Sequence, residues 1–231
     1  FVILSSFSIR AQVNSIPFSQ SLDTFQYITG TVVDMANEDD VFHDNLPIGF
    51  NFTYNGQVTS KFGISTNGYI LLDSLPHGSP WIFGSTCLNQ VSAMMGDLYN
   101  ENLGGSIEYL TVGTAPNRVC IIQWKDYGIF AVPYCHLNFQ IRLHETSNCI
   151  QFYYGDNDYS ITAGVDFFVG LTGDSTTDFN LRTCATDWTN SSPSLTFGIT
   201  GMFMNPLTIQ PSGLVFSYGS CPSTGITFSY L

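Results

Sequence analysis

The stretch LPIGFNFTYNGQVTSKFGISTNGYILL, residues 46–72, decides the fold class of this chain. Every second residue in its first part is large and apolar, which is the period of a strand with one buried face; these residues are Ile48, Phe50, Phe52 and Tyr54. Two Asn-Gly pairs follow, at 55–56 and 67–68, and such pairs are strong signals for tight hairpin turns. The stretch therefore predicts three antiparallel strands joined by short turns.

The same style continues through the rest of the chain. Long strands are expected over residues 118–127, 135–145 and 149–154, and a closing strand over 209–218. Within 135–145 apolar and polar residues alternate, which predicts one buried face and one face in water; the polar set is Asn138, Gln140, Arg142 and His144. Frequent strands separated by Gly, Asn, Asp and Pro predict an all-β fold, an antiparallel β-sandwich or jelly roll.

Three segments are expected along the chain. Residues 1–12, FVILSSFSIRAQ, combine an apolar stretch with a small-residue exit and are read as a leader remnant or an N-terminal strand. Residues 13–218 form the β-sandwich module. Residues 219–231 open with Gly-Ser-Cys-Pro and are read as a linker or the start of a following module.

Composition limits the class of partner. The chain has 231 residues, 44% of them hydrophobic and 15% aromatic, so it can bury a sizeable core. Only 10% are charged, which argues against long exposed helices. The 18 acidic residues outnumber the 6 basic ones, so nucleic acid and anionic lipid headgroups are repelled. We expect no nucleic-acid partner, and after residue 12 no apolar run is long enough for membrane insertion.

Six cysteines indicate an oxidising compartment and hence a secreted or cell-surface protein; they are Cys87, Cys120, Cys135, Cys149, Cys184 and Cys221. None forms a Cys-x-x-Cys pair, which argues against a zinc ribbon or a redox motif. We expect at least one disulfide, with Cys184–Cys221 and Cys87–Cys135 as pairings, because these positions lie in loops or at strand ends. Cys120 and Cys149 lie inside apolar strands and are alternatively plain buried thiols.

Several motifs together resemble a known family. They are residues 46–72, GTAPNRVCIIQWKDY (113–127), LNFQIRLHETSNCIQFYYGD (137–156) and PSGLVFSY (211–218). In this order they resemble the extracellular β-sandwich modules of exported Bacteroidetes proteins, over about residues 18–218, and more weakly nidogen-like domains. The resemblance implies type IX secretion to the cell surface. It also implies a structural or adhesive module in a larger exported protein or assembly, with other surface proteins or further copies of itself as partners.

An acidic stretch is the one place where the sequence offers a cofactor site. Residues 34–44 carry five acids without a Lys or Arg, and converging carboxylates are what calcium binds. The expected calcium ligands are Asp34, Asp39, Asp40 and Asp44. The spacing matches no EF-hand loop, so the plainer interpretation, a solvated acidic loop without a cofactor, is preferred.

Catalysis is not expected. There is no Gly-x-Ser-x-Gly elbow and no zinc-binding histidine pair. Scattered acids show no spacing that would place two carboxylates across a cleft; they are Asp97, Glu101, Glu108, Asp126 and Glu145. No catalytic residue is assigned, and the chain is read as a binding or structural module.

Loop aromatics provide the alternative function, a carbohydrate-binding module with glycans as partners and calcium as a possible aid. Trp81 and Trp188 lie in loop-like segments, and Tyr159 lies beside the turn at Asp156. Exposed rings of this kind stack on sugars. The simpler interpretation is that they cover edges of the core.

Overall fold

The computed structural model describes residues 12–34, 38–72, 88–100, 104–130, 132–157, 168–175, 177–182, 194–195, 199–200 and 212–222. These residues form strands, turns and one short 3-10 helix, η1 (Val13–Ser15), and none of them is in an α-helix. Every pairing of these strands is antiparallel. The predicted all-β antiparallel fold is confirmed.

The larger of two facing sheets has the strand order β1, β16, β11, β10, β9, β8, β2, with β7 added beside β9. Its strands are β1 (Phe18–Leu22), β2 (Thr31–Asp34), β7 (Leu98–Tyr99), β8 (Ser106–Val112), β9 (Val119–Ile129), β10 (Val132–His144), β11 (Ile150–Tyr154) and β16 (Leu214–Tyr218).

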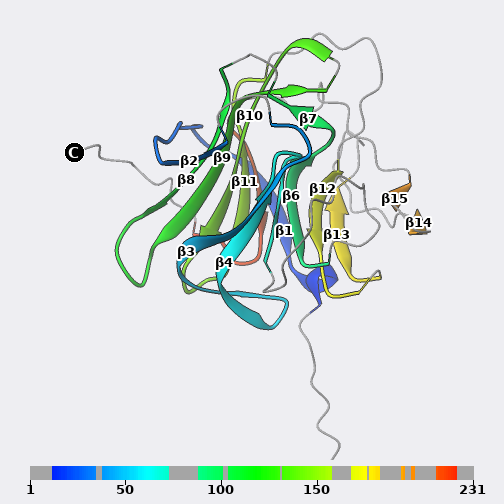
Figure 1. Cartoon of the computed structure of the whole chain (residues 1–231). Helices are drawn as coiled ribbons and strands as arrows, with labels where there is room; N and C mark the ends of the chain where they lie inside the picture. The colour runs from blue at the N-terminus through cyan, green and yellow to red at the C-terminus, as the bar shows by residue number, and fades with distance from the viewer. Residues whose placement is uncertain are drawn as a thin grey trace, which may run out of the picture.

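The smaller sheet has the order β13, β12, β6, β5, β4, β3. Its strands are β3 (Phe42–Tyr54), β4 (Gln57–Ser65), β5 (Tyr69–Leu71), β6 (Gln90–Met95), β12 (Phe168–Thr172) and β13 (Phe179–Arg182). A separate short pair consists of β14 (Ser194–Leu195) and β15 (Ile199–Thr200). Figure 1 shows the two main sheets packed as layers of a sandwich.

The hairpin signals in residues 46–72 are confirmed. Asn55 and Gly56 both have positive φ, 47° and 73°, as a two-residue turn between β3 and β4 requires. Gly68, in the second Asn-Gly pair, has φ of 83° and lies so close to the carbonyl oxygen of Met94 that a Cβ would clash with it. These turns place β3, β4 and β5 side by side as predicted.

The main core lies between the two sheets. Trp124 of β9 stacks on Phe139 of β10 with ring centroids 4.8 Å apart, and both side chains are fully buried. Phe52, Phe62 and Ile70 of the smaller sheet belong to the same apolar cluster. The removal of these large apolar side chains from water is the main favourable contribution to the free energy that holds the two layers together.

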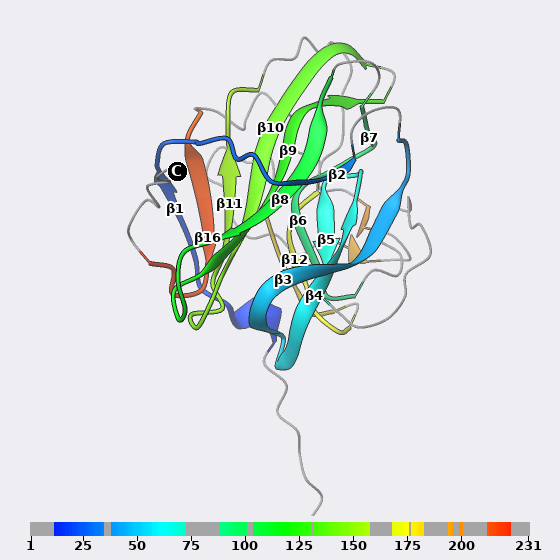
Figure 2. The same cartoon turned by 60° about the vertical axis from the view of Figure 1, so that its left-hand side comes forward.

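The outer face of the larger sheet corrects one expectation. The polar residues of β10 were expected to face water, yet Gln140 and Arg142 are 0% and 2% exposed. The connection from β1 to β2 crosses this face over β11, β10, β9 and β8 (Figure 2). Its backbone bonds to the sheet, since Ile28 N donates to Gln123 Oε1 and Gln140 Nε2 donates to the carbonyl oxygen of Gln26. A covering segment therefore makes the second face dry.

One disulfide joins Cys149 to Cys221, with Cα atoms 5.1 Å apart. The expectation of at least one disulfide is confirmed, but the pairing Cys184–Cys221 is wrong, and so is the reading of Cys149 as a free thiol. The register explains the partner. Ile150 of β11 pairs with Tyr218 of β16, so the residues just before β11 and just after β16 lie side by side.

The other cysteines fall into two groups. Cys120 is a buried thiol, as the alternative reading expected, and burial raises its pKa to about 12. Cys135 is buried in β10. Cys87 and Cys184 lie outside the described residues, as do residues 1–11, so the pairing Cys87–Cys135 and the reading of the N-terminal segment stay predictions.

No helix among the described residues is long and apolar enough to cross a membrane.

Candidate functional site

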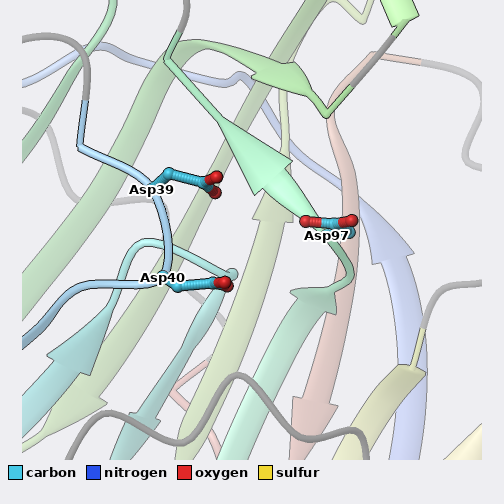
Figure 3. Close-up of side chains that lie close together, drawn as sticks. All are labelled: Asp39, Asp40 and Asp97. Carbon is cyan, nitrogen blue, oxygen red and sulfur yellow. The ribbon is translucent and has the colours of Figure 1, made fainter.

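Three carboxylates meet at one end of the sandwich. Asp39 and Asp40 lie on the connection between β2 and β3, and Asp97 lies between β6 and β7. Each offers an oxygen, and these oxygens lie within 4.8 Å of one another. Figure 3 shows the three side chains converging from two separate segments. We call this group the acidic cluster.

The second Asn-Gly turn holds the acidic cluster in place. Nδ2 of Asn67 donates to Oδ1 of Asp40 at 2.8 Å, and the backbone N–H of Leu98 donates to Oδ1 of Asn67 at 2.9 Å. One buried amide thereby ties both acidic segments to the turn. A backbone bridge from Asp39 to Tyr99 adds a second link.

The electrostatics of the acidic cluster are those of mutual repulsion. Burial, followed by the charges of Asp40 and Asp97, raises the pKa of Asp39. Burial and the charge of Asp40 raise the pKa of Asp97. Such a group can hold a divalent cation, which would replace the repulsion by attraction. Three carboxylates supply part of the six to eight oxygens that calcium takes.

The structure combines only some of the expected calcium ligands. The acidic cluster contains Asp39 and Asp40 but neither Asp34 nor Asp44, and Asp97 joins from another part of the chain. Asp34 is buried, and the hydroxyl of Tyr127 donates to its Oδ2. Asp44 lies on β3, where its Oδ1 accepts from the backbone N–H of Asn45 at 2.8 Å. Of the four predicted ligands, the structure therefore brings only Asp39 and Asp40 together.

The sequence did not indicate that Asp97 belongs to the acidic cluster, because Asp97 lies 57 positions after Asp40 in the chain. Asp97 follows Gly96 directly after a buried apolar strand, which is a turn signal, but nothing local indicates which loop lies opposite.

Two of the acids considered for catalysis have structural partners. Oε2 of Glu108 accepts from the backbone N–H of Gly30 at 2.9 Å. Glu145 accepts from Nε of Arg118 at 2.9 Å, and this hydrogen bond lowers the pKa of Glu145 to about 2. Both carboxylates thus hold strands or connections together.

The sugar-stacking candidates Trp81, Trp188 and Tyr159 lie outside the described residues. Their proposed role stays a prediction.

Comparison with protein families gives one finding that bears on identity. Residues 16–211 match the family model described as NIDO related. This range nearly coincides with the segment over which the sequence resembles a known family, and it confirms the nidogen-like part of that resemblance. Comparison with curated proteins and with solved structures gives no match. The family match indicates an extracellular structural or adhesive module. The disulfide agrees with an extracellular location, because such bonds persist in oxidising compartments. The chain belongs to the NIDO-related family.

Proposed function

We propose that this chain is a non-catalytic surface module with a structural or adhesive role in a larger exported protein. The family match over residues 16–211 carries the proposal. The disulfide between Cys149 and Cys221 supports it, because such bonds persist in oxidising compartments. The structural partners of Glu108 and Glu145 support the non-catalytic part, since those acids already serve the fold.

The finer assignment is to the exported surface proteins of Bacteroidetes, carried by the type IX secretion route. The motifs in residues 113–127 and 137–156 support it. Sequencing the complete gene tests this part. We expect further adhesive domains and a C-terminal secretion signal; a gene that encodes a cytosolic enzyme around this segment would contradict the proposal.

Surface exposure is tested on the producing cells. Antibodies raised against the folded module should label intact cells, and brief protease treatment of intact cells should remove the label. A periplasmic or cytosolic marker protein is the control, because it must survive the same treatment. Labelling that appears only after permeabilisation would overturn the surface role.

The adhesive role is tested with the purified module. Partners are proposed to be other surface proteins or further copies of the module. Sedimentation velocity over a range of concentrations measures self-association, and cross-linking on intact cells identifies neighbouring proteins. A module that stays monomeric and cross-links to no surface protein would contradict both proposed classes of partner.

The acidic cluster supports a second candidate, a carbohydrate-binding module assisted by calcium. A cation on Asp39, Asp40 and Asp97 would present open coordination positions to sugar hydroxyls. Calorimetric titration with calcium tests the first half of this candidate. Its control is Asp39→Asn with Asp40→Asn, which removes two of the three carboxylates while the Asp97 loop is kept.

A further inference from the structure

Two cavities meet at Asp23, where the chain leaves β1. One, of ≈ 440 Å³, follows the outer face of the larger sheet over β1, β16 and β11. The other, of ≈ 310 Å³, adjoins Asp156 and Gly213. Since β1 and β11 end where β16 begins, the cavities succeed each other along β16. We call the pair the outer groove.

A row of polar side chains forms the floor of the outer groove. The register pairs Ser19 with Ser217 and Ser217 with Gln151, so all three project from neighbouring strands. Nε2 of Gln151 donates to Oγ of Ser217 at 3.0 Å, and Oε1 of Gln151 lies 2.7 Å from Nε2 of His144. The amide is thereby held in one orientation. The hydroxyl of Ser217 accepts this bond and keeps its own proton for another acceptor.

The carboxylate of Asp23 is fixed at the junction of the two cavities. The hydroxyl of Tyr153 donates to Oδ2 of Asp23 at 3.0 Å, and the backbone N–H of Thr24 donates to Oδ1 at 2.7 Å. Behind the Tyr153 ring, the guanidinium carbon of Arg142 lies 3.4 Å from the ring centroid. Each carboxylate oxygen can accept a further hydrogen bond, so Asp23 is an oriented acceptor facing the groove.

The second cavity adds an aromatic wall. The rings of Phe25 and Tyr27 meet edge to face with centroids 5.1 Å apart, and Tyr27 is 41% exposed. Asp156 stands beside them on a loop that is tied to the sheet, since Nδ2 of Asn138 donates to the Asp156 carbonyl oxygen at 2.7 Å. Tyr27 and Asp156 line the same cavity, so an apolar ring face and a polar group lie within one small space.

This combination of groups selects a ligand chemistry. Serine hydroxyls and an amide offer both donors and acceptors, and two carboxylates accept hydrogen bonds from hydroxyls. Asp23 and Asp156 repel an anionic ligand, as does the net charge of −12. A peptide with apolar side chains would need apolar pockets, which this polar floor does not offer. A neutral sugar fits, because it carries hydroxyls around its ring and an apolar C–H face for Tyr27.

We propose that the outer groove binds a neutral oligosaccharide, with Asp23, Ser217 and Gln151 recognising hydroxyl groups and Tyr27 stacking on a sugar ring. The inference rests on the adhesive function proposed above and names a ligand class for it. The proposal uses neither the loop aromatics Trp81 and Trp188 nor a metal ion.

The probe is an array of immobilised neutral and anionic glycans, applied to the purified module. We expect binding to neutral members and none to anionic ones. The strongest neutral oligosaccharide is then titrated against the module in solution. Asp23→Asn should weaken its affinity by about tenfold, because a charged acceptor is replaced by a neutral one.

A matched pair of variants separates the groove from the rest of the surface. Ser21 of β1 lines the outer groove, whereas Ser60 of β4 is an exposed serine of the opposite sheet. Ser21→Phe should abolish sugar binding by filling the groove. Ser60→Phe should leave the affinity unchanged. Equal thermal stability of the two variants shows that both are folded, and phenylalanine is well tolerated in strands.

Several outcomes would overturn the inference. They are a folded wild-type module that binds no neutral glycan on the array, an unchanged affinity in Ser21→Phe, and binding of peptides in place of sugars. Surface labelling and self-association without any glycan binding would contradict the sugar-binding groove but would leave the proposed surface role supported. Failure of the antibodies to label intact cells would contradict the surface role, whereas the measured affinity of the outer groove for sugars would be unaffected.

Discussion

Strand β10 has two buried faces of opposite chemistry. Phe139 and Leu143 point into the sandwich, while Gln140 and Arg142 lie on the opposite face, where Gln140 bonds to the connection from β1 to β2, and all four are nearly or fully inaccessible to water. The inner face gains its stability from apolar area and close packing. The outer face depends on each polar group finding its partner, because a buried group without one costs more than a good bond contributes. The two faces are equally buried, but mutations on them should lower the stability of the fold for different reasons: loss of packing on the inner face and loss of hydrogen-bond partners on the outer face.

The outer face is a connected network. Gln140 accepts from Nε and Nη2 of Arg142 at 3.0 and 2.8 Å, and it donates to Oε1 of Gln123 and to the carbonyl oxygen of Gln26. Arg142 also lies against the ring of Tyr153, which borders the outer groove. The network thus links the covering segment, the sheet and the groove.

The largest effect is expected on the inner face. Trp124→Ala removes a fully buried ring that stacks on Phe139, and we expect the free energy of unfolding to fall by about 3–5 kcal/mol. Urea denaturation followed by circular dichroism measures it. Trp124→Phe, which keeps an aromatic ring, should lose much less. A loss below about 1 kcal/mol in Trp124→Ala would show that the two layers are held mainly by other contacts.

The next effect is a pH dependence of the free energy of unfolding, and it comes from His144 on the polar face of β10. Burial, with the positive charge of Arg142, lowers the pKa of His144 from 6.5 to about 4. The folded state therefore binds the proton less well than the unfolded state, so the contribution of neutral His144 is complete above pH 6.5 and is lost as pH falls towards about 4. Across that window the free energy of unfolding should drop by up to about 1.4 kcal/mol per pH unit from this residue.

His144→Gln isolates that contribution, because the other acids of the chain titrate in both proteins. The difference between wild type and variant should shrink as pH falls. A constant difference between about pH 7 and pH 4 would mean that His144 is protonated in the folded protein without cost.

A smaller effect tests the outer network directly. Gln140→Leu leaves Arg142 without its Gln140 acceptor and the Gln26 carbonyl without its donor, and we expect a loss of about 2 kcal/mol in unfolding free energy. Gln57→Leu, at an exposed position of β4, is the matched control and should change stability by less than about 0.5 kcal/mol. Equal losses of unfolding free energy in Gln140→Leu and Gln57→Leu would show that the buried polar network contributes nothing particular to stability.

The smallest effect concerns the acidic cluster. A solvated group of carboxylates needs no ion, so replacing millimolar calcium by a chelator should shift the melting temperature by less than about 1 °C. Differential scanning fluorimetry measures this. A clear rise with calcium that disappears in Asp39→Asn/Asp40→Asn would instead establish the calcium-assisted candidate.

The sequence by itself determined the features that depend on neighbours along the chain. The alternation in residues 46–72 and the two Asn-Gly pairs specified strands and turns, because side-chain period and turn conformation are local properties. The acidic stretch likewise revealed Asp39 and Asp40, two of the three members of the acidic cluster.

Only the tertiary structure decided which distant segments meet. The partner of Cys221 follows from the register of β11 with β16, and Asp97 joins the acidic cluster because the buried Asn67 ties its loop to Asp40. Gln140 is inaccessible to water because the connection from β1 to β2 crosses its sheet and bonds to it through Gln26. An alternating pattern states which residues share a face, but it contains no information about what covers that face, because the covering segment lies more than a hundred residues away in the chain.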